Sequence, residues 1–128
     1  MSNQKDNNKE YKEVAFDVMK EGTCFTVENQ DGSLADVTEN DILQYIQYIV
    51  EDNQQFATLT APKAIGGIRF VQAAVNNGEI EVEIGVEKEK CHLYYKMCTQ
   101  EECEKIFLEF FHGEFVAKME EYKPVLFM

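Results

Sequence analysis

Long hydrophobic runs are absent from this chain of 128 residues. A membrane-spanning helix needs about 20 consecutive apolar residues, whereas the apolar stretches here have strand length, so no transmembrane helix is expected. The N-terminal sequence MSNQKDNNKE lacks the apolar core of a signal peptide. We therefore expect a cytoplasmic protein that forms a single domain over residues 1–128, with residues 1–9 as a disordered tail.

Motifs for metals, phosphates and nucleic acids are also missing. The four cysteines stand at positions 24, 91, 98 and 103, without the close Cys-x-x-Cys pairs of a zinc site. A chain without a signal peptide keeps its thiols reduced, so we interpret these cysteines as buried thiols. Gly66-Gly67 has no lysine at the offset of a phosphate loop, and no basic stripe is present. We expect no metal, no cofactor, and neither nucleic acid nor membrane as a partner.

Basic residues are scarce. The chain has 24 acidic and 12 basic residues, a net charge of −12, and residues 21–62 contain eight acids and no Lys or Arg. Such a field repels phosphates and anionic membranes and speeds encounter with basic proteins. Negative charge that only keeps a small protein soluble is the plainer interpretation. The long stretch without a base favours an acidic binding surface.

The clearest pattern that is present spans Ile68 to Met97 and predicts three antiparallel strands at the centre of a sheet. Asn77-Gly78 is typical of a two-residue type I′ turn, because both residues tolerate positive φ. This turn predicts apolar pairs on one face of the hairpin: Val75–Ile80, Ala73–Val82 and Val71–Ile84. The other face then carries Ala74–Glu81, Gln72–Glu83 and Phe70–Gly85, in which an aromatic ring covers a bare glycine. A slip of one residue would bury the two glutamates.

The next hairpin is predicted to turn through the four residues 87–90. This loop sets three more apolar pairs on the inner face: Ile84–Leu93, Val82–Tyr95 and Ile80–Met97. On the outer face it places Lys96 opposite Glu81, and it puts His92 and Tyr94 on the same side as Glu83.

Two amphipathic helices are predicted. The first begins after the N-cap Thr38, ends near Asp52-Asn53 and has an apolar stripe at helical spacing: Ile42, Leu43, Ile46, Ile49 and Val50. The second begins with a capping box of Thr99 and Glu102 and ends at Gly113, a natural C′ residue. Its apolar face contains Cys103, Ile106, Phe107, Phe110 and Phe111.

Beside the apolar stripe of the first helix runs a second stripe, the helix shoulder, formed by Asp41, Tyr45, Tyr48 and Asp52. Tyrosines next to carboxylates favour a binding surface, since Tyr is enriched at hot spots. In the alternative interpretation, both rings lie over the rim of the core with their hydroxyls in water. The sequence does not choose between the two.

The remaining segments are shorter. Residues 11–19 fit two patterns: Val14, Phe16 and Val18 alternate as in a strand, whereas Tyr11, Val14, Ala15 and Val18 have helical spacing, and we favour a short helix. We also expect strands at 24–28 and 34–37, and a strand at 56–60 that Ala61-Pro62 ends, because proline cannot donate to a sheet. A last extended segment is predicted at 122–128. Together these elements predict an α+β fold: an antiparallel sheet of about five to six strands with amphipathic helices packed on one face.

No catalytic motif is recognisable. Glu79, Glu81 and Glu83 point the same way from one strand, about 7 Å apart, but glycosidases draw their acids from separate elements around a cleft. A solvated sheet face is the default for this row, and a protein-binding face is the best functional alternative. His92 with Glu83 could do acid–base work, but no nucleophile accompanies them, so we do not expect an enzyme.

The segment GIRFVQAAVNNGEIEVEIGVEKEKCHLYYK, followed by CTQEECEKIFLEFFHGEF, resembles small bacterial immunity proteins of polymorphic-toxin and contact-dependent inhibition systems. The resemblance covers the second half of the chain and implies a cytoplasmic protein that binds and neutralises a cognate toxin, commonly a basic nuclease. The resemblance assigns no function to any individual residue. The acidic charge agrees independently with a basic partner.

The leading hypothesis is therefore an immunity protein that blocks a basic toxin domain by occlusion. The candidate partner-binding residues lie on the helix shoulder and on the outer sheet face: Asp41, Tyr45, Tyr48, Asp52, Phe70, Gln72, Glu81, Glu83 and Tyr94. The alternative is an acidic, dimeric secretion chaperone for an exported effector. A small enzyme that uses His92 and Glu83 would need a pocket above the sheet.

Overall fold

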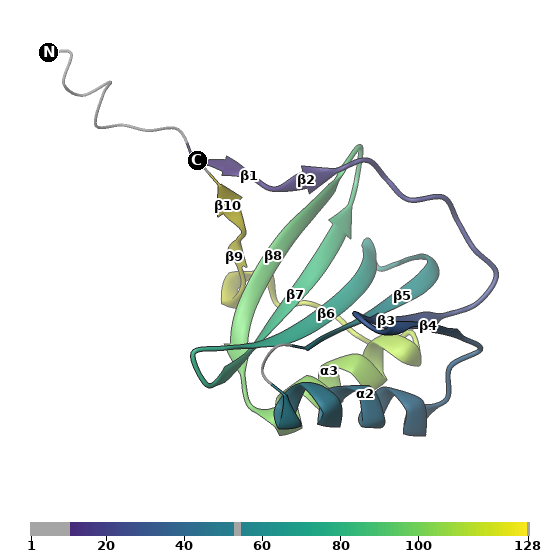
Figure 1. Cartoon of the computed structure of the whole chain (residues 1–128). Coiled ribbons are helices and arrows are strands. Elements are labelled where there is room, and N and C mark those ends of the chain that lie inside the picture. The colour runs from purple at the N-terminus through teal and green to yellow at the C-terminus, as the bar shows by residue number, and fades with distance from the viewer. Residues whose placement is uncertain (1–10, 53–54, 128) are drawn as a thin grey trace, which may run out of the picture.

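The chain folds as an antiparallel sheet with two helices packed on one face (Figure 1). The computed structural model describes residues 11–52 and 55–127. The strands are β1 (Lys12–Glu13), β2 (Ala15–Phe16), β3 (Thr26–Asn29), β4 (Gly32–Ala35), β5 (Phe56–Ile65), β6 (Ile68–Asn76), β7 (Glu79–Glu87), β8 (Cys91–Cys98), β9 (Lys123–Pro124) and β10 (Leu126–Phe127). The helices are α2 (Glu39–Glu51), α3 (Gln100–Phe111) and a short 3₁₀ turn, η1 (Met119–Glu121).

The predicted fold class is confirmed. In the described part of the chain the main sheet has eight strands, in the order β2-β8-β7-β6-β5-β3-β4, and β9 also pairs with β8. The sheet is larger than the expected five to six strands because β2 and β9 add to the edge at β8. A separate two-stranded sheet joins β1 to β10, beside the C-terminal end in Figure 1. We call the sheet face turned away from α2 and α3 the outer face.

The core lies between the sheet and the two helices. Ile42, Ile46 and Ile49 of α2 and Phe107 and Phe110 of α3 have no exposed side-chain surface. They pack in one cluster with the inner residues of the strands, Val27, Leu59, Val71, Val82 and Ile84. Each such side chain stabilises the fold by about 1.5–3 kcal/mol when buried. The stripe predicted for the first helix is thus correct at its centre.

The first hairpin has the predicted register. Asn77 and Gly78 take φ values of 54° and 81°, as a type I′ turn requires. Every predicted pair between β6 and β7 is present, from Val75–Ile80 to Phe70–Gly85.

The second hairpin is one residue out of the predicted register. Its loop has three residues, because Lys88 N donates to Lys90 O at 2.9 Å and Glu87 already pairs with Cys91. The side chains of β8 therefore change faces. The pairs observed in place of the predicted ones are Ile84–Tyr94, Val82–Lys96, Ile80–Cys98 and Glu81–Met97.

The predicted helix at residues 11–19 is wrong, because two short strands form here instead: β1 pairs with β10, and β2 pairs with the edge of β8. Val14 bridges two neighbours: its N–H donates to Val125 O at 2.9 Å, and its carbonyl accepts from Leu93 N at 3.2 Å. The predicted end of the strand at Ala61-Pro62 is also wrong. β5 continues through Pro62, where its pairing with β6 is interrupted by a register shift and the missing N–H removes no ladder bond.

The predicted N-cap Thr38 and the predicted capping box of Thr99 and Glu102 are confirmed, and Thr38 also forms a capping box with Asp41. Gly113 ends α3 with φ 73°, and the N–H groups of Gly113 and Glu114 close a Schellman motif on Phe110 and Glu109. The predicted tail at residues 1–9, the helix end at Asn53 and the last residue of the final segment lie outside the described residues. Within the described ranges, no helix has the length and apolarity to span a membrane.

A buried arginine ties the connection between β2 and β3 to the sheet. Arg69, 3% exposed, donates to the carbonyls of Ala61 at 2.9 Å, Met19 at 2.8 Å and Lys20 at 2.5 Å. It also pairs with Glu87 at 3.3 Å. Gly22 N also donates to Pro62 O at 2.8 Å. Together these contacts hold residues 17–22 against the end of the sheet where the β5–β6 and β7–β8 hairpins turn.

Candidate functional site

The outer face brings together four of the predicted binding residues. Phe70 and Gln72 come from β6 and Glu81 and Glu83 from β7, and the register places Gln72 opposite Glu83. All four side chains are half-buried. The prediction for these residues follows from the first hairpin, whose turn and alternation agree.

A chain of hydrogen bonds crosses three strands on this face. Thr58 Oγ1 of β5 donates to Gln72 Oε1 at 2.6 Å, and Gln72 Nε2 donates to Glu83 Oε1 at 3.4 Å. Asn76 Nδ2 donates to Glu81 Oε1 at 3.1 Å. The two carboxyl groups are therefore oriented by amides from the neighbouring strand rather than by a cation.

The carboxyl groups of Glu81 and Glu83 are neighbours on β7, and a hydrogen bond joins them. The pKa of Glu83 is raised from its ordinary value of 4.5 to about 7, first by burial, then by a hydrogen bond to Glu81 and by the negative charge of Glu81. Protonation lets Glu83 donate to Glu81, which removes the repulsion between two like charges on one strand. With this pKa, Glu83 is only partly ionised near neutral pH.

Within residues 11–52 and 55–127, no base forms an ion pair with these acids. Glu28, Glu79, Glu81 and Glu83 all point outward in the register, and none of them forms an ion pair within the described ranges. The predicted partner of Glu81, Lys96, lies on the helix side of the sheet. There it binds Glu121 at 2.9 Å and Glu102 at 3.8 Å and lies over the ring of Tyr122.

The outer-face prediction for Tyr94 is wrong. Tyr94 pairs with Ile84 and packs against the core, whereas Tyr95 pairs with Glu83 and belongs to the outer face. The pattern of apolar residues in the sequence could not reveal the correct register of β8. Cys91 and Leu93 are apolar and buried although they lie on the outer side of this strand, apart from the main core cluster. The missed residue is Tyr95, and the three-residue loop is the only signal that would have placed it.

The helix shoulder is only partly available for binding. Asp41 accepts the N–H of Thr38 at 2.9 Å as part of the cap, and Tyr45 packs against the core. Tyr48, 40% exposed, meets Tyr45 edge-on at 5.8 Å between ring centroids. Asp52 follows the helix end and accepts from Gln55 at 3.4 Å. The two tyrosines line a cleft of about 370 Å³ with the turn between β3 and β4.

The histidines do not form a catalytic pair. His92 pairs with Val86 and Glu83 with Tyr95, so the two side chains lie on opposite faces of the sheet. His92 instead lies 3.2 Å from Glu13, and His112 binds Glu39 at the start of α2. Within residues 11–52 and 55–127, no three His, Cys, Asp or Glu side chains are placed to hold a metal ion.

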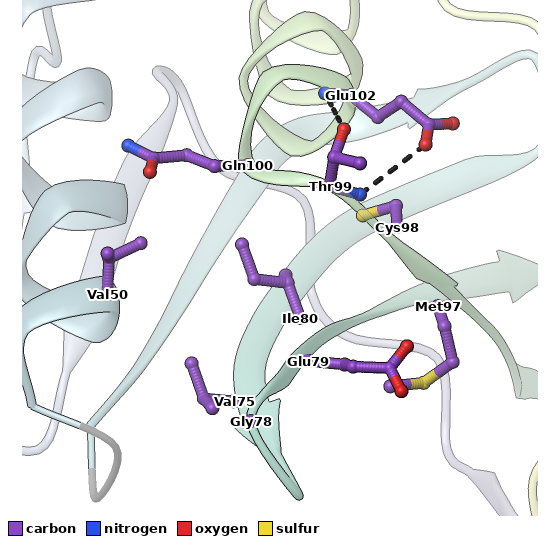
Figure 2. A pocket seen from close by; sticks show the side chains of 10 residues that line it. All are labelled: Val50, Val75, Gly78, Glu79, Ile80, Met97, Cys98, Thr99, Gln100 and Glu102. Atoms are coloured by element: carbon purple, nitrogen blue, oxygen red, sulfur yellow. Dashed lines mark hydrogen bonds between the residues drawn. The ribbon is translucent and has the colours of Figure 1, made fainter.

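A second cleft, of about 550 Å³, lies where the end of α2, the start of α3 and the β6–β7 turn meet (Figure 2). Its apolar walls come from Val50, Val75, Ile80 and Met97, and Cys98 lines it directly before the Thr99 cap. The thiol of buried Cys103 hydrogen-bonds Cys98; this bond lowers the pKa of Cys98 and raises that of Cys103. The polar groups that line the cleft are those of the helix cap, the Cys98 thiol and the side chains of Glu79 and Gln100.

Comparison with known proteins adds no assignment. No protein-family model, curated protein or solved structure matches this chain. Function must therefore be argued from the surfaces described above.

Proposed function

We propose that this chain is a bacterial immunity protein that binds a basic toxin domain in the cytoplasm and blocks it by occlusion. The binding surface is the outer face of the sheet, centred on Gln72, Glu81, Glu83 and Tyr95. The observation that supports this proposal is the row of outward carboxyl groups without an ion-pair partner in the described chain. The resemblance of the second half of the chain to immunity proteins points the same way.

A basic partner would supply ion-pair partners for Glu81 and Glu83 on the outer face. An Arg or Lys placed between Glu81 and Glu83 would displace the proton of Glu83 and form charge-assisted hydrogen bonds. Tyr95 and Met97, which is 38% exposed, flank the carboxyl groups and offer apolar contact area. The net charge of −12 would speed the encounter. The protein needs no chemistry of its own for this role.

The helix shoulder suits this role less well. The carboxylate of Asp41 is engaged in the cap of α2, and Tyr45 contributes to the core. Substitution at either residue would therefore disturb the fold as well as any interface. Tyr48 is the more exposed of the two rings on this surface.

The test compares two double variants with the same net charge. Glu81→Gln/Glu83→Gln neutralises the outer face, and Glu114→Gln/Glu120→Gln removes two exposed acids that follow α3. Pull-downs from a lysate of the source bacterium, at low and high salt, identify the partner. The captured domain is then expressed alone, where it should arrest growth, and co-expressed with each variant.

We expect the wild type and the control to restore growth and the outer-face variant to bind at least tenfold more weakly. Equal binding by both double variants would exclude the outer face. A captured domain that is harmless when expressed alone would exclude the immunity role.

The secretion chaperone is a second candidate because β4 leaves one sheet edge open. All four of its residues are exposed, and its pairing in the described chain is with β3 only. Such an edge could pair with a second copy or with an extended segment. A dimer in sedimentation experiments, with capture of an unfolded exported protein, would favour the chaperone over the immunity protein.

A further inference from the structure

The start of α3 brings two cysteines together. Thr99 is the N-cap and Glu102 the third helical residue, so Cys98 and Cys103 occupy the positions just before the cap and fourth in the helix. In capped helices these two positions hold apolar side chains that contact each other across the first turn. Here both are cysteines, and their thiols are hydrogen-bonded to each other.

The two thiols differ in access. Cys98 is half-buried and lines the cleft of about 550 Å³ shown in Figure 2, whereas Cys103 is fully buried behind it. A small solute that enters the cleft therefore meets Cys98 first. Cys103 is positioned to react only with what forms on Cys98.

The surroundings also favour a thiolate at Cys98. The hydrogen bond from Cys103 lowers the pKa of Cys98, and the charge of Lys96 acts in the same direction. Burial and the charge of Glu102 oppose this, but the net change is a decrease. A thiolate at the N-terminus of a helix is the reactive form of cysteine. The other cysteines, Cys24 and Cys91, have no cysteine as a hydrogen-bonding partner among the described contacts.

We propose that Cys98 and Cys103 form a redox-responsive pair that a hydroperoxide converts into an intramolecular disulfide across the start of α3. This site is separate from the outer face and does not depend on the proposed toxin binding. Closing the disulfide joins the wall of the cleft covalently to the first turn of the helix.

The chemistry needs one hydroperoxide and no metal. The Cys98 thiolate attacks the terminal peroxide oxygen, an S–O bond forms and the O–O bond breaks, and the leaving oxygen takes up a proton as water or an alcohol. The product is a sulfenic acid at Cys98. The Cys103 sulfur then attacks this sulfur and the S–S bond forms, while hydroxide leaves and takes the thiol proton as water. The two thiols have supplied the two electrons, and an external dithiol reverses the step.

The test treats the full chain with hydrogen peroxide and blocks remaining thiols with an alkylating agent. Digestion with a Glu-specific protease then cuts at Glu101 and Glu102, between the two cysteines. The peptides on either side of these cuts stay joined only if Cys98 and Cys103 are linked. We expect this linked product, lighter by two hydrogens, from the wild type and from Cys24→Ser, and its loss after treatment with a dithiol.

The variants separate the two roles. Cys98→Ser should give no linked product, and Cys103→Ser should accumulate a sulfenic acid at Cys98 that dimedone traps. The proposal is overturned if Cys103 stays reduced in the wild type while Cys98 is oxidised to the sulfinic or sulfonic acid. Oxidation of Cys24 ahead of Cys98, or linkage only between two chains, would overturn it as well.

Discussion

The ring of Phe70 lies across Gly85, its partner on the neighbouring strand, so closely that a Cβ atom at Gly85 would lie 2.3 Å from Cε2 of the ring. Two further ring atoms, Cζ and Cδ2, would lie within 2.8 Å of the same Cβ. The backbone of Gly85 has no positive φ, so contact with the ring is what selects glycine here. The aromatic ring and the bare strand backbone form one unit on the outer face.

Gly85→Ala should destabilise the protein by about 1–3 kcal/mol, because the added methyl group forces the ring out of its place. In a Phe70→Ala background the same change should be neutral or stabilise by about 0.5–1 kcal/mol, since alanine restricts the unfolded chain more than glycine does. Urea unfolding of the four proteins measures this reversal of sign. An equal effect of Gly85→Ala in both backgrounds would contradict the contact.

Arg69→Met should destabilise the protein by about 3–5 kcal/mol, because Glu87 and three carbonyl groups lose a buried donor. The segment that contains Lys20 should also come loose, so limited trypsin digestion should cut after Lys20 much faster than in the wild type. The control is Lys90→Gln, which removes only the exposed ion pair with Asp17. That change should cost less than about 1 kcal/mol. Similar stability and trypsin resistance in both variants would argue against the role of Arg69.

Stability should fall as pH rises through the range set by Glu83. Its folded-state pKa is raised from 4.5 to about 7, so between these values the folded protein holds a proton that the unfolded chain has lost. The contribution of Glu83 to the free energy of unfolding is fully present below about pH 4.5 and is lost as pH approaches 7. Because the carboxyl group is partly solvated, screening reduces the effect to about 1 kcal/mol.

The check compares unfolding free energies at pH 5 and pH 8. Glu83→Gln should resemble the wild type at pH 5 and be more stable than the wild type at pH 8. The control is Glu79→Gln, which removes an exposed acid from the same strand. In this variant the unfolding free energy should change between pH 5 and pH 8 as it does in the wild type. If the unfolding free energy of Glu83→Gln changed with pH as in the wild type, another group would be responsible for the pH dependence.

Thr99→Ala should destabilise the protein by about 1 kcal/mol, because the Thr99 hydroxyl accepts the N–H of Glu102 at 3.1 Å at the start of α3. Thr99→Ser keeps this acceptor and should stay within a few tenths of a kcal/mol of the wild type. Thermal unfolding of the three proteins measures the difference. If alanine and serine have the same effect, the cap contributes through packing rather than through the hydrogen bond.

The two hairpins show how far local sequence can specify a register. For β6 and β7, Asn77-Gly78 defines the turn, and strict alternation around Glu81 and Glu83 allows only one pairing. For β7 and β8, the loop of alternating Glu and Lys fits three residues as well as four. Apolar side chains occur on both sides of β8, so alternation there excludes neither register.

The sequence by itself determined the elements whose signals are local: both helices with their N-caps Thr38 and Thr99, the Gly113 end of α3, the first hairpin and the α+β class. Caps, turns and periodicity act over a few residues, so they can be recognised without the rest of the chain. Only the tertiary structure decided that β1 pairs with β10, that β2 pairs with the edge of β8 and that β5 passes through Pro62. It also decided that Tyr95 rather than Tyr94 joins Glu83 on the outer face. These outcomes depend on partners distant in sequence, whose hydrogen bonds outweigh local preference.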